Sequence, residues 1–128
     1  MEYLIIGIIV LVLMLPYLLM RVSTCAMVGK PAPAMDDVIS SNTDMEKPVY
    51  LYFMSERCSN CKKMTPVIEE QGRQNPNVIT INISNEREKG VRFGVRGTPT
   101  LLSVKDGVIE RVKLGAMTRH KILDFISA

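Results

Sequence analysis

Cys58 and Cys61 are the residues of this sequence whose type and spacing most directly suggest chemistry. On a helix the two cysteines lie about one turn apart, so a disulfide bond can form and break between them. Two thiolates are also soft ligands that suit Cu(I). The motif alone therefore leaves redox chemistry and metal binding open.

The position of this pair between a predicted strand and a predicted helix favours redox chemistry. Val49–Met54 is a continuous apolar run typical of a strand buried on both faces. Ser59–Gln71 repeats apolar residues at helical steps, and Gly72 is the predicted end of that helix. The unpaired N–H groups at a helix N-terminus stabilise a thiolate at Cys58, and Arg57 adds a cation beside it. We expect Cys58 to attack a disulfide and Cys61 to resolve the mixed disulfide that results.

The remaining segments predict the elements that would hold this junction. Val78–Ile83 predicts a second strand and Ser84–Lys89 a short helix capped by Ser84 or Asn85, and this order implies a right-handed crossover. Thr100–Val104 and Val108–Leu114 flank an Asp-Gly pair, which predicts a hairpin. Apolar spacing after Thr118 predicts a last helix. The fold class is therefore α/β.

Several landmarks follow the cysteines in a fixed order. They are Lys62 and Pro66, the segment Phe93–Thr100, and the glycines of Asp106-Gly107 and Gly115-Ala116. Together with Cys58-Ser59-Asn60-Cys61, this pattern resembles the thioredoxin superfamily from about Val49 to the C-terminus. The resemblance implies a thioredoxin-like three-layer α/β/α sandwich with a mixed four-stranded central sheet.

The resemblance also implies the roles of the site residues. Cys58 and Cys61 would be the catalytic residues and form the redox-active disulfide, so no separate cofactor or metal is expected. Thr98-Pro99 would be a cis peptide bond against the cysteines, with the Thr98 backbone pairing with an extended substrate segment. Thr98, Pro99 and Arg57 are the predicted substrate-binding residues. The expected partners are protein thiols or disulfides and a redox partner protein.

Five positions depart from the family pattern. Arg57 replaces the usual Trp, and Ser59-Asn60 replaces Gly-Pro between the cysteines. Tyr52 stands where the family has a buried Asp, and Thr80 where it has the Lys partner of that Asp. Proton handling must therefore differ, and the changed dipeptide alters the redox tuning. These departures argue against a general thioredoxin.

The N-terminal segment predicts a membrane helix. Tyr3–Met20 carries no charge and is bounded by Glu2 and Arg21. As a helix it would span roughly 27 Å, close to the ~30 Å hydrocarbon layer. A cleaved signal peptide is the alternative, although no basic residue precedes the apolar run. In either case Cys25 would lie at the membrane edge.

We expect three regions along the chain. These are a transmembrane anchor over residues 1–21, a linker with one possible short helix near Met35–Ser40 over residues 22–47, and a thioredoxin-like domain over residues 48–128. Arg21 and Lys30 favour a cytoplasmic domain. Val28–Pro33, however, resembles the first segment of membrane-anchored, cytochrome-maturation-type thioredoxins and of peroxiredoxins. We follow that resemblance and expect a single-pass membrane protein with a periplasmic or extracytoplasmic domain.

Composition excludes other classes of protein. The net charge is only +3, no basic run exceeds Lys62-Lys63 and tryptophan is absent, so a nucleic-acid surface is not expected. Three cysteines do not make a disulfide scaffold. His120, the single histidine, is expected on a solvated helix face, so a four-ligand zinc site has no evident completion.

Three functions compete. The first is a membrane-tethered thiol–disulfide oxidoreductase acting on protein disulfides, as a specialised reductant of exported proteins. The second is copper delivery or binding through the same cysteine pair. The third is a redox-inert adaptor, against which retention of both cysteines argues.

Overall fold

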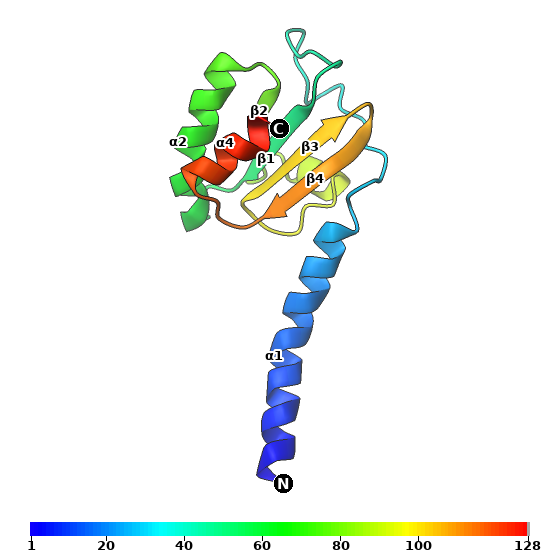
Figure 1. Cartoon of the computed structure of the whole chain (residues 1–128), viewed down its shortest axis with the longest axis vertical. Helices are drawn as coiled ribbons and strands as arrows, with labels where there is room; N and C mark the ends of the chain where they lie inside the picture. The colour runs from blue at the N-terminus through cyan, green and yellow to red at the C-terminus, as the bar shows by residue number, and fades with distance from the viewer. Residues whose placement is uncertain (128) are drawn as a thin grey trace.

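One mixed sheet of four strands forms the centre of the domain (Figure 1). In the computed structural model, residues 1–127 are described, without the side chains of residues 24 and 25. The strands are β1 (Val49–Met54), β2 (Val78–Asn82), β3 (Thr100–Lys105) and β4 (Val108–Leu114). They lie in the order β2-β1-β3-β4. β2 runs parallel to β1, whereas β1–β3 and β3–β4 are antiparallel, as the predicted mixed sheet requires.

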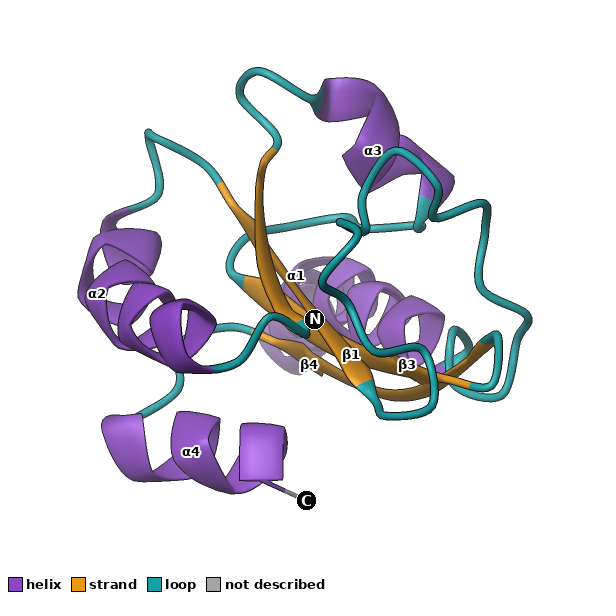
Figure 2. Ribbon diagram, turned by 90° about the horizontal axis from the view of Figure 1, so that it is seen from above, coloured by secondary structure: helices purple, strands orange, loops and turns teal. Residues whose placement is uncertain are grey.

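Helices cover both faces of the sheet, which confirms the predicted three layers. α2 (Ser59–Gln74) and α4 (Arg119–Ser127) lie on one side, and α3 (Arg87–Arg92) lies on the other (Figure 2). β1 is buried on both faces because its side chains alternate between two cores. Tyr50 and Tyr52 pack toward α2 and α4, whereas Leu51 and Phe53 pack on the opposite side.

The segment between α1 and β1 packs on the domain, where a linker was expected. The Gly29 N–H donates to the Ile109 carbonyl at 2.8 Å, and the Ala32 N–H donates to that of Gly107 at 2.7 Å, so this segment borders β4. Met35 is buried in the core beside β1 and β3. The residues that follow Met35 form turns in place of the possible helix, with the Val38 and Ile39 N–H groups both donating to the Met35 carbonyl.

Two predicted helix boundaries were wrong, for reasons that depend on neighbouring strands. Gly72 does not stop α2, which continues to Gln74. A Cβ at Gly72 would lie 3.3 Å from the Val78 carbonyl oxygen, so this glycine allows α2 to approach β2. Neither Ser84 nor Asn85 caps α3, whose N-cap residue is Glu86. The Ser84 hydroxyl instead lies 3.2 Å from the Ser55 hydroxyl and accepts from the Glu56 N–H at 3.2 Å. Ser84 therefore holds the loop that leads into α2.

α1 (Glu2–Cys25) projects away from the sheet as a single helix (Figure 1). Within residues 1–127 it is the one helix long and apolar enough to cross a membrane, over Glu2–Ser23, although a signal sequence passes the same test. No residue of this stretch is buried, although Met20 near its end contacts Gly97 of the domain. Its 22 residues measure about 33 Å along the axis, which matches the ~30 Å hydrocarbon layer.

Candidate active site

The cysteine pair lies at the junction of β1 and α2. Cys58 is the N-cap residue of α2, and its Sγ accepts a hydrogen bond from the Cys61 N–H at 3.1 Å. The two residues form a disulfide, with their Cα atoms 5.2 Å apart. The first turn of α2 therefore directs N–H groups and the positive end of the helix dipole toward Cys58, the arrangement that stabilises a thiolate.

The two sulfurs differ in their access to solvent. Cys61 is fully buried, with 0% of its surface exposed, whereas Cys58 is only half-buried. A partner protein can therefore reach Cys58 before it can reach Cys61. This difference assigns attack on the partner to Cys58 and resolution to Cys61.

The sheet brings the Thr98–Pro99 loop to the same end of the domain. Phe53 of β1 lies opposite Thr100 of β3, so the chain leaving β1 toward Cys58 and the chain entering β3 meet at one edge. Ser55 and Thr98 line the same hollow of about 280 Å³. The Thr98–Pro99 peptide bond is cis. Pro99 is buried and Thr98 is half-buried.

Two further hydrogen bonds hold this loop. The Pro99 carbonyl accepts from the Gly115 N–H at 2.8 Å, which ties the loop to the end of β4. The Thr100 hydroxyl donates to the Gly97 carbonyl at 2.6 Å. Gly115 has a φ of +101°, a conformation that glycine adopts without strain. The half-buried Thr98 is thus held between two anchored neighbours.

A tyrosine and a threonine hold the backbone of the buried cysteine. The Tyr52 hydroxyl donates to the Cys61 carbonyl at 3.3 Å and lies 3.1 Å from the Thr65 hydroxyl. Thr65 donates to the same carbonyl at 2.7 Å. Burial raises the pKa of Tyr52, with a smaller opposing effect from its hydrogen bond to Thr65, so its phenol stays neutral at physiological pH.

Sequence reasoning identified the position of Tyr52 but missed Thr65. The available signal was the spacing, because a threonine four residues after a helical residue can donate back to that residue's carbonyl. Arg57 is exposed directly before Cys58, and its backbone N–H donates to the Ser55 hydroxyl at 3.4 Å. Its contact with substrate stays a prediction.

The other residues singled out in the sequence lie away from this site or outside the description. His120 is exposed on α4 and pairs with Asp124 at 2.8 Å. The Cys25 thiol lies outside the described side chains. Among the described residues, no group of three or more His, Cys, Asp or Glu side chains is placed to hold a metal ion. The pair would therefore offer a metal two thiolate ligands.

Known proteins resemble the chain beyond α1. Residues 34–128 match the family model described as thioredoxin. A thioredoxin of Pseudomonas aeruginosa is 34% identical over 84 residues, which cover 63% of this chain and 78% of that protein. A thioredoxin of Rhodospirillum rubrum is 32% identical, with 63% and 81% covered. A solved mutant thioredoxin from Halobacterium salinarum NRC-1 superposes with a TM-score of 0.60 at 29% identity, covering 73% of this chain and 80% of that one.

Proposed function

This chain belongs to the thioredoxin family, and from that premise we propose that it is a membrane-tethered reductant of selected protein disulfides. Family membership and the Cys58–Cys61 pair make the chain a thiol–disulfide oxidoreductase. The family also implies protein thiol substrates and a redox partner in general terms. The tether, the reducing direction and the choice of exported substrates are the proposal.

The reaction follows from the positions of the two sulfurs. In the reduced protein the Cys58 thiolate attacks one sulfur of a substrate disulfide, breaking that bond and releasing the other substrate sulfur as a thiolate. The Cys61 thiolate then attacks the Cys58 sulfur, which forms the Cys58–Cys61 disulfide and releases the second substrate thiol. Two electrons pass to the substrate, and a dithiol partner protein must return them.

The observation that carries the proposal is the difference in exposure between the two cysteines. Only the half-buried Cys58 is accessible for a mixed disulfide, and the buried Cys61 lies one turn behind it. Tyr52 supports a specialised role because it is a neutral phenol where the family has a carboxylate. Ser59-Asn60 supports it as well, since the dipeptide between the cysteines tunes the redox potential.

α1 supports the tether. It is long and apolar enough to span a bilayer, and none of its residues over this span is buried in the domain. The Val28–Pro33 resemblance favours a periplasmic or extracytoplasmic domain, and a topology reporter fused after Ala128 tests the side. A redox titration of the cysteine pair tests the direction. A midpoint potential well above that of the cellular dithiol donors would contradict a reducing role.

Trapping of mixed disulfides tests the assigned roles. A Cys25→Ser background leaves the pair as the chain's only cysteines. In that background, Cys61→Ser should accumulate mixed disulfides with substrates, whereas Cys58→Ser should trap none and have no exchange activity. Non-reducing gels of membranes after acid quenching measure both outcomes. Equal trapping by the two variants would overturn the assignment of attack to Cys58.

Copper delivery through the same two thiolates is the competing proposal. Two soft sulfur ligands suit Cu(I), and a partner protein would have to complete the site. Titration of the reduced full chain with Cu(I) separates the two functions. Stoichiometric Cu(I) binding without any reduction of protein disulfides would favour delivery over exchange.

A further inference from the structure

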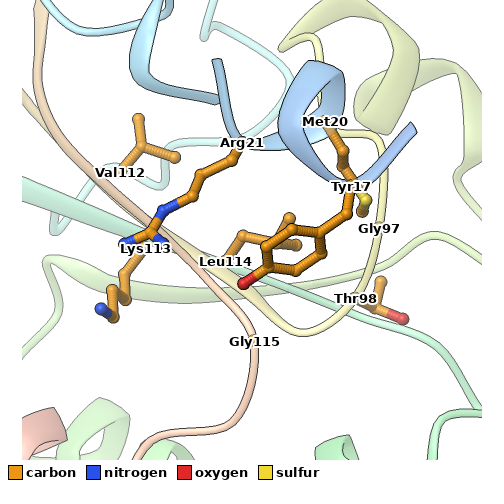
Figure 3. A pocket seen from close by; sticks show the side chains of 9 residues that line it. All are labelled: Tyr17, Met20, Arg21, Gly97, Thr98, Val112, Lys113, Leu114 and Gly115. Carbon is orange, nitrogen blue, oxygen red and sulfur yellow. The ribbon is translucent and has the colours of Figure 1, made fainter. Parts of the chain in front are cut away.

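A pocket joins the end of α1 to the loop that precedes β3. Its volume is about 580 Å³ (Figure 3). α1 contributes one wall and the end of β4 another, and the loop at Gly97 and Thr98 lies between them. The lining residues used below are Tyr17, Met20, Arg21, Gly97, Thr98 and Leu114. The pocket therefore includes both a predicted substrate-binding residue and the last turns of the apolar helix.

The contact between α1 and this loop is close. A Cβ at Gly97 would lie 2.9 Å from Met20 Cε and 3.4 Å from Leu114 Cδ1, so no larger residue fits there without a shift. Figure 3 shows the Met20 side chain directed toward Gly97. The loop that carries Thr98 thus lies against α1 itself rather than at a distance set by a flexible linker.

This contact sets the height of the active site relative to a bilayer. The candidate membrane span of α1 ends at Ser23, so Tyr17, Met20 and Arg21 occupy its last turns. Tyr and Arg favour the membrane–water interface, where their apolar parts stay in lipid and their polar ends reach water. Gly97 and Thr98, which line the same pocket, would then lie at the level of the lipid headgroups.

The sheet places the disulfide at the same end of the domain. Phe53, Thr100 and Leu114 lie side by side in the register of β1, β3 and β4. In Figure 1, α1 leaves the domain from the end where β1 leads into α2 and β3 begins. The half-buried Cys58 follows β1 at this end, so the bilayer lies on the active-site side of the domain.

We infer that α1 turns the substrate groove toward the membrane, so that the preferred substrate is a disulfide in an extended segment of an integral membrane protein, next to the headgroups. The pocket beside Thr98 takes an apolar side chain of that segment. Its walls include Tyr17, Met20 and Leu114. The cationic Arg21 and Lys113 favour an acidic residue beside that apolar side chain in the substrate segment. This inference rests on the proposed tether, and the exchange steps are those given above.

A substrate series in lipid vesicles tests the inference with the full chain. Each substrate carries the same disulfide, joined to one transmembrane helix by a flexible spacer of about 4 or about 30 residues, the longer reaching roughly 30 Å. A soluble peptide with that disulfide is the third substrate. We expect the short-spacer substrate to be reduced about tenfold faster than the long-spacer one, because its disulfide is concentrated at the headgroup level. Equal rates, or a faster long-spacer substrate, would overturn the inference.

An insertion variant provides the matched control. About 15 Gly and Ser residues inserted between Ala26 and Met27 keep the anchor and the disulfide but release the domain from α1. The preference for the short spacer should disappear, while the soluble peptide is still reduced. A preference that survives the insertion would contradict a role for the α1 contact. Loss of soluble-peptide reduction in the parent chain would instead count against the proposed function itself.

A second variant tests the pocket without disturbing the domain. Tyr17 is 59% exposed on α1, so Tyr17→Ala removes a pocket wall while leaving the two cores intact. We expect a severalfold slower reduction of the short-spacer substrate, whereas Ile9→Ala, which removes an exposed α1 side chain outside the pocket, should leave that rate unchanged. An unchanged short-spacer rate would show that the pocket does not take the substrate segment, as when a lipid chain fills it.

Discussion

α1 contacts the loop at Gly97, and α2 begins at the disulfide, but different surroundings stabilise the two helices. α2 has one apolar stripe, and Cys61, Met64 and Ile68 on that stripe are buried against the sheet. α1 is apolar all round, and most of its large side chains are about half exposed or more. Protein packing therefore specifies α2, whereas α1 has the length and composition of a candidate membrane span and, among its described side chains, contributes no buried residue to the cores. Substitutions should accordingly affect stability in α2 and membrane location in α1.

Truncating one isoleucine in each helix gives the largest expected difference in stability. Ile68 of α2 is fully buried, so Ile68→Ala should lower the free energy of unfolding by about 2–5 kcal/mol. Ile9 of α1 is 51% exposed, so Ile9→Ala should leave it unchanged. Urea unfolding of the full chain in detergent micelles, followed by circular dichroism, measures both. A comparable loss in the two variants would show that α1 packs on protein.

A charge in the middle of α1 tests its lipid surroundings. Leu11 is 62% exposed, so Leu11→Lys should not destabilise the domain. It should cost about 3 kcal/mol of membrane insertion, because a charged residue at the centre of a spanning helix is unfavourable. The fraction of protein that resists alkaline extraction from membranes measures insertion, with Leu11→Ile as the control. Full retention of the lysine variant would argue that α1 does not span the bilayer.

The fold was predictable where local patterns decide the structure. The strands around β1 and the Asp-Gly hairpin are specified by apolar runs and turn residues, and their bounds agree within one residue. Gly72 and Ser84 were misassigned because their roles depend on Val78 and Ser55, which lie on other elements. A single sequence shows that a glycine or serine can end or cap a helix, but not which neighbour it contacts.

The same distinction holds at the site. The cysteine pair carries its own signal in spacing and context, and the sequence placed it at the strand-to-helix junction where it lies. The hydrogen bond from Thr65 to the Cys61 carbonyl had only a weak sequence signal, since many helical threonines donate in this way. The pocket beside Thr98 was not predictable, because it exists only through the contact of Met20 with Gly97.

The hydrogen bond from Tyr52 to the Cys61 carbonyl tests how much the contacts between β1 and α2 stabilise the fold. Tyr52→Phe removes a donor to the Cys61 carbonyl but leaves the bond from Thr65, so we expect a loss of about 1 kcal/mol in unfolding free energy. Thr65→Val removes the shorter bond and should cost at least as much. Urea unfolding of the oxidised and reduced forms measures both. An unchanged stability in Tyr52→Phe would mean that its hydroxyl makes no net contribution.

The same substitution changes the dependence of stability on pH. Burial raises the pKa of Tyr52 above its ordinary value of 10.0, so the folded chain keeps this proton to a higher pH than the unfolded chain. The free energy of unfolding should therefore fall as the pH rises above about 10, because the unfolded chain loses this proton first. Tyr52→Phe should make this loss less steep. Burial raises the pKa of Tyr50 as well, so part of the slope should remain.

The smallest expected effect lies where α1 meets the domain. Gly97→Ala places a methyl group 2.9 Å from Met20 Cε, and a methionine side chain can rotate away from it. We expect a loss below about 1 kcal/mol, less than the usual cost of overpacking in a core. Met20→Ala in the same chain should relieve it, so a double-mutant cycle measured by urea unfolding should give a favourable coupling between the two substitutions. Zero coupling in the membrane-inserted protein would mean that α1 and the loop at Gly97 do not touch. α1 would then neither stabilise the domain, as α2 does, nor fix its position.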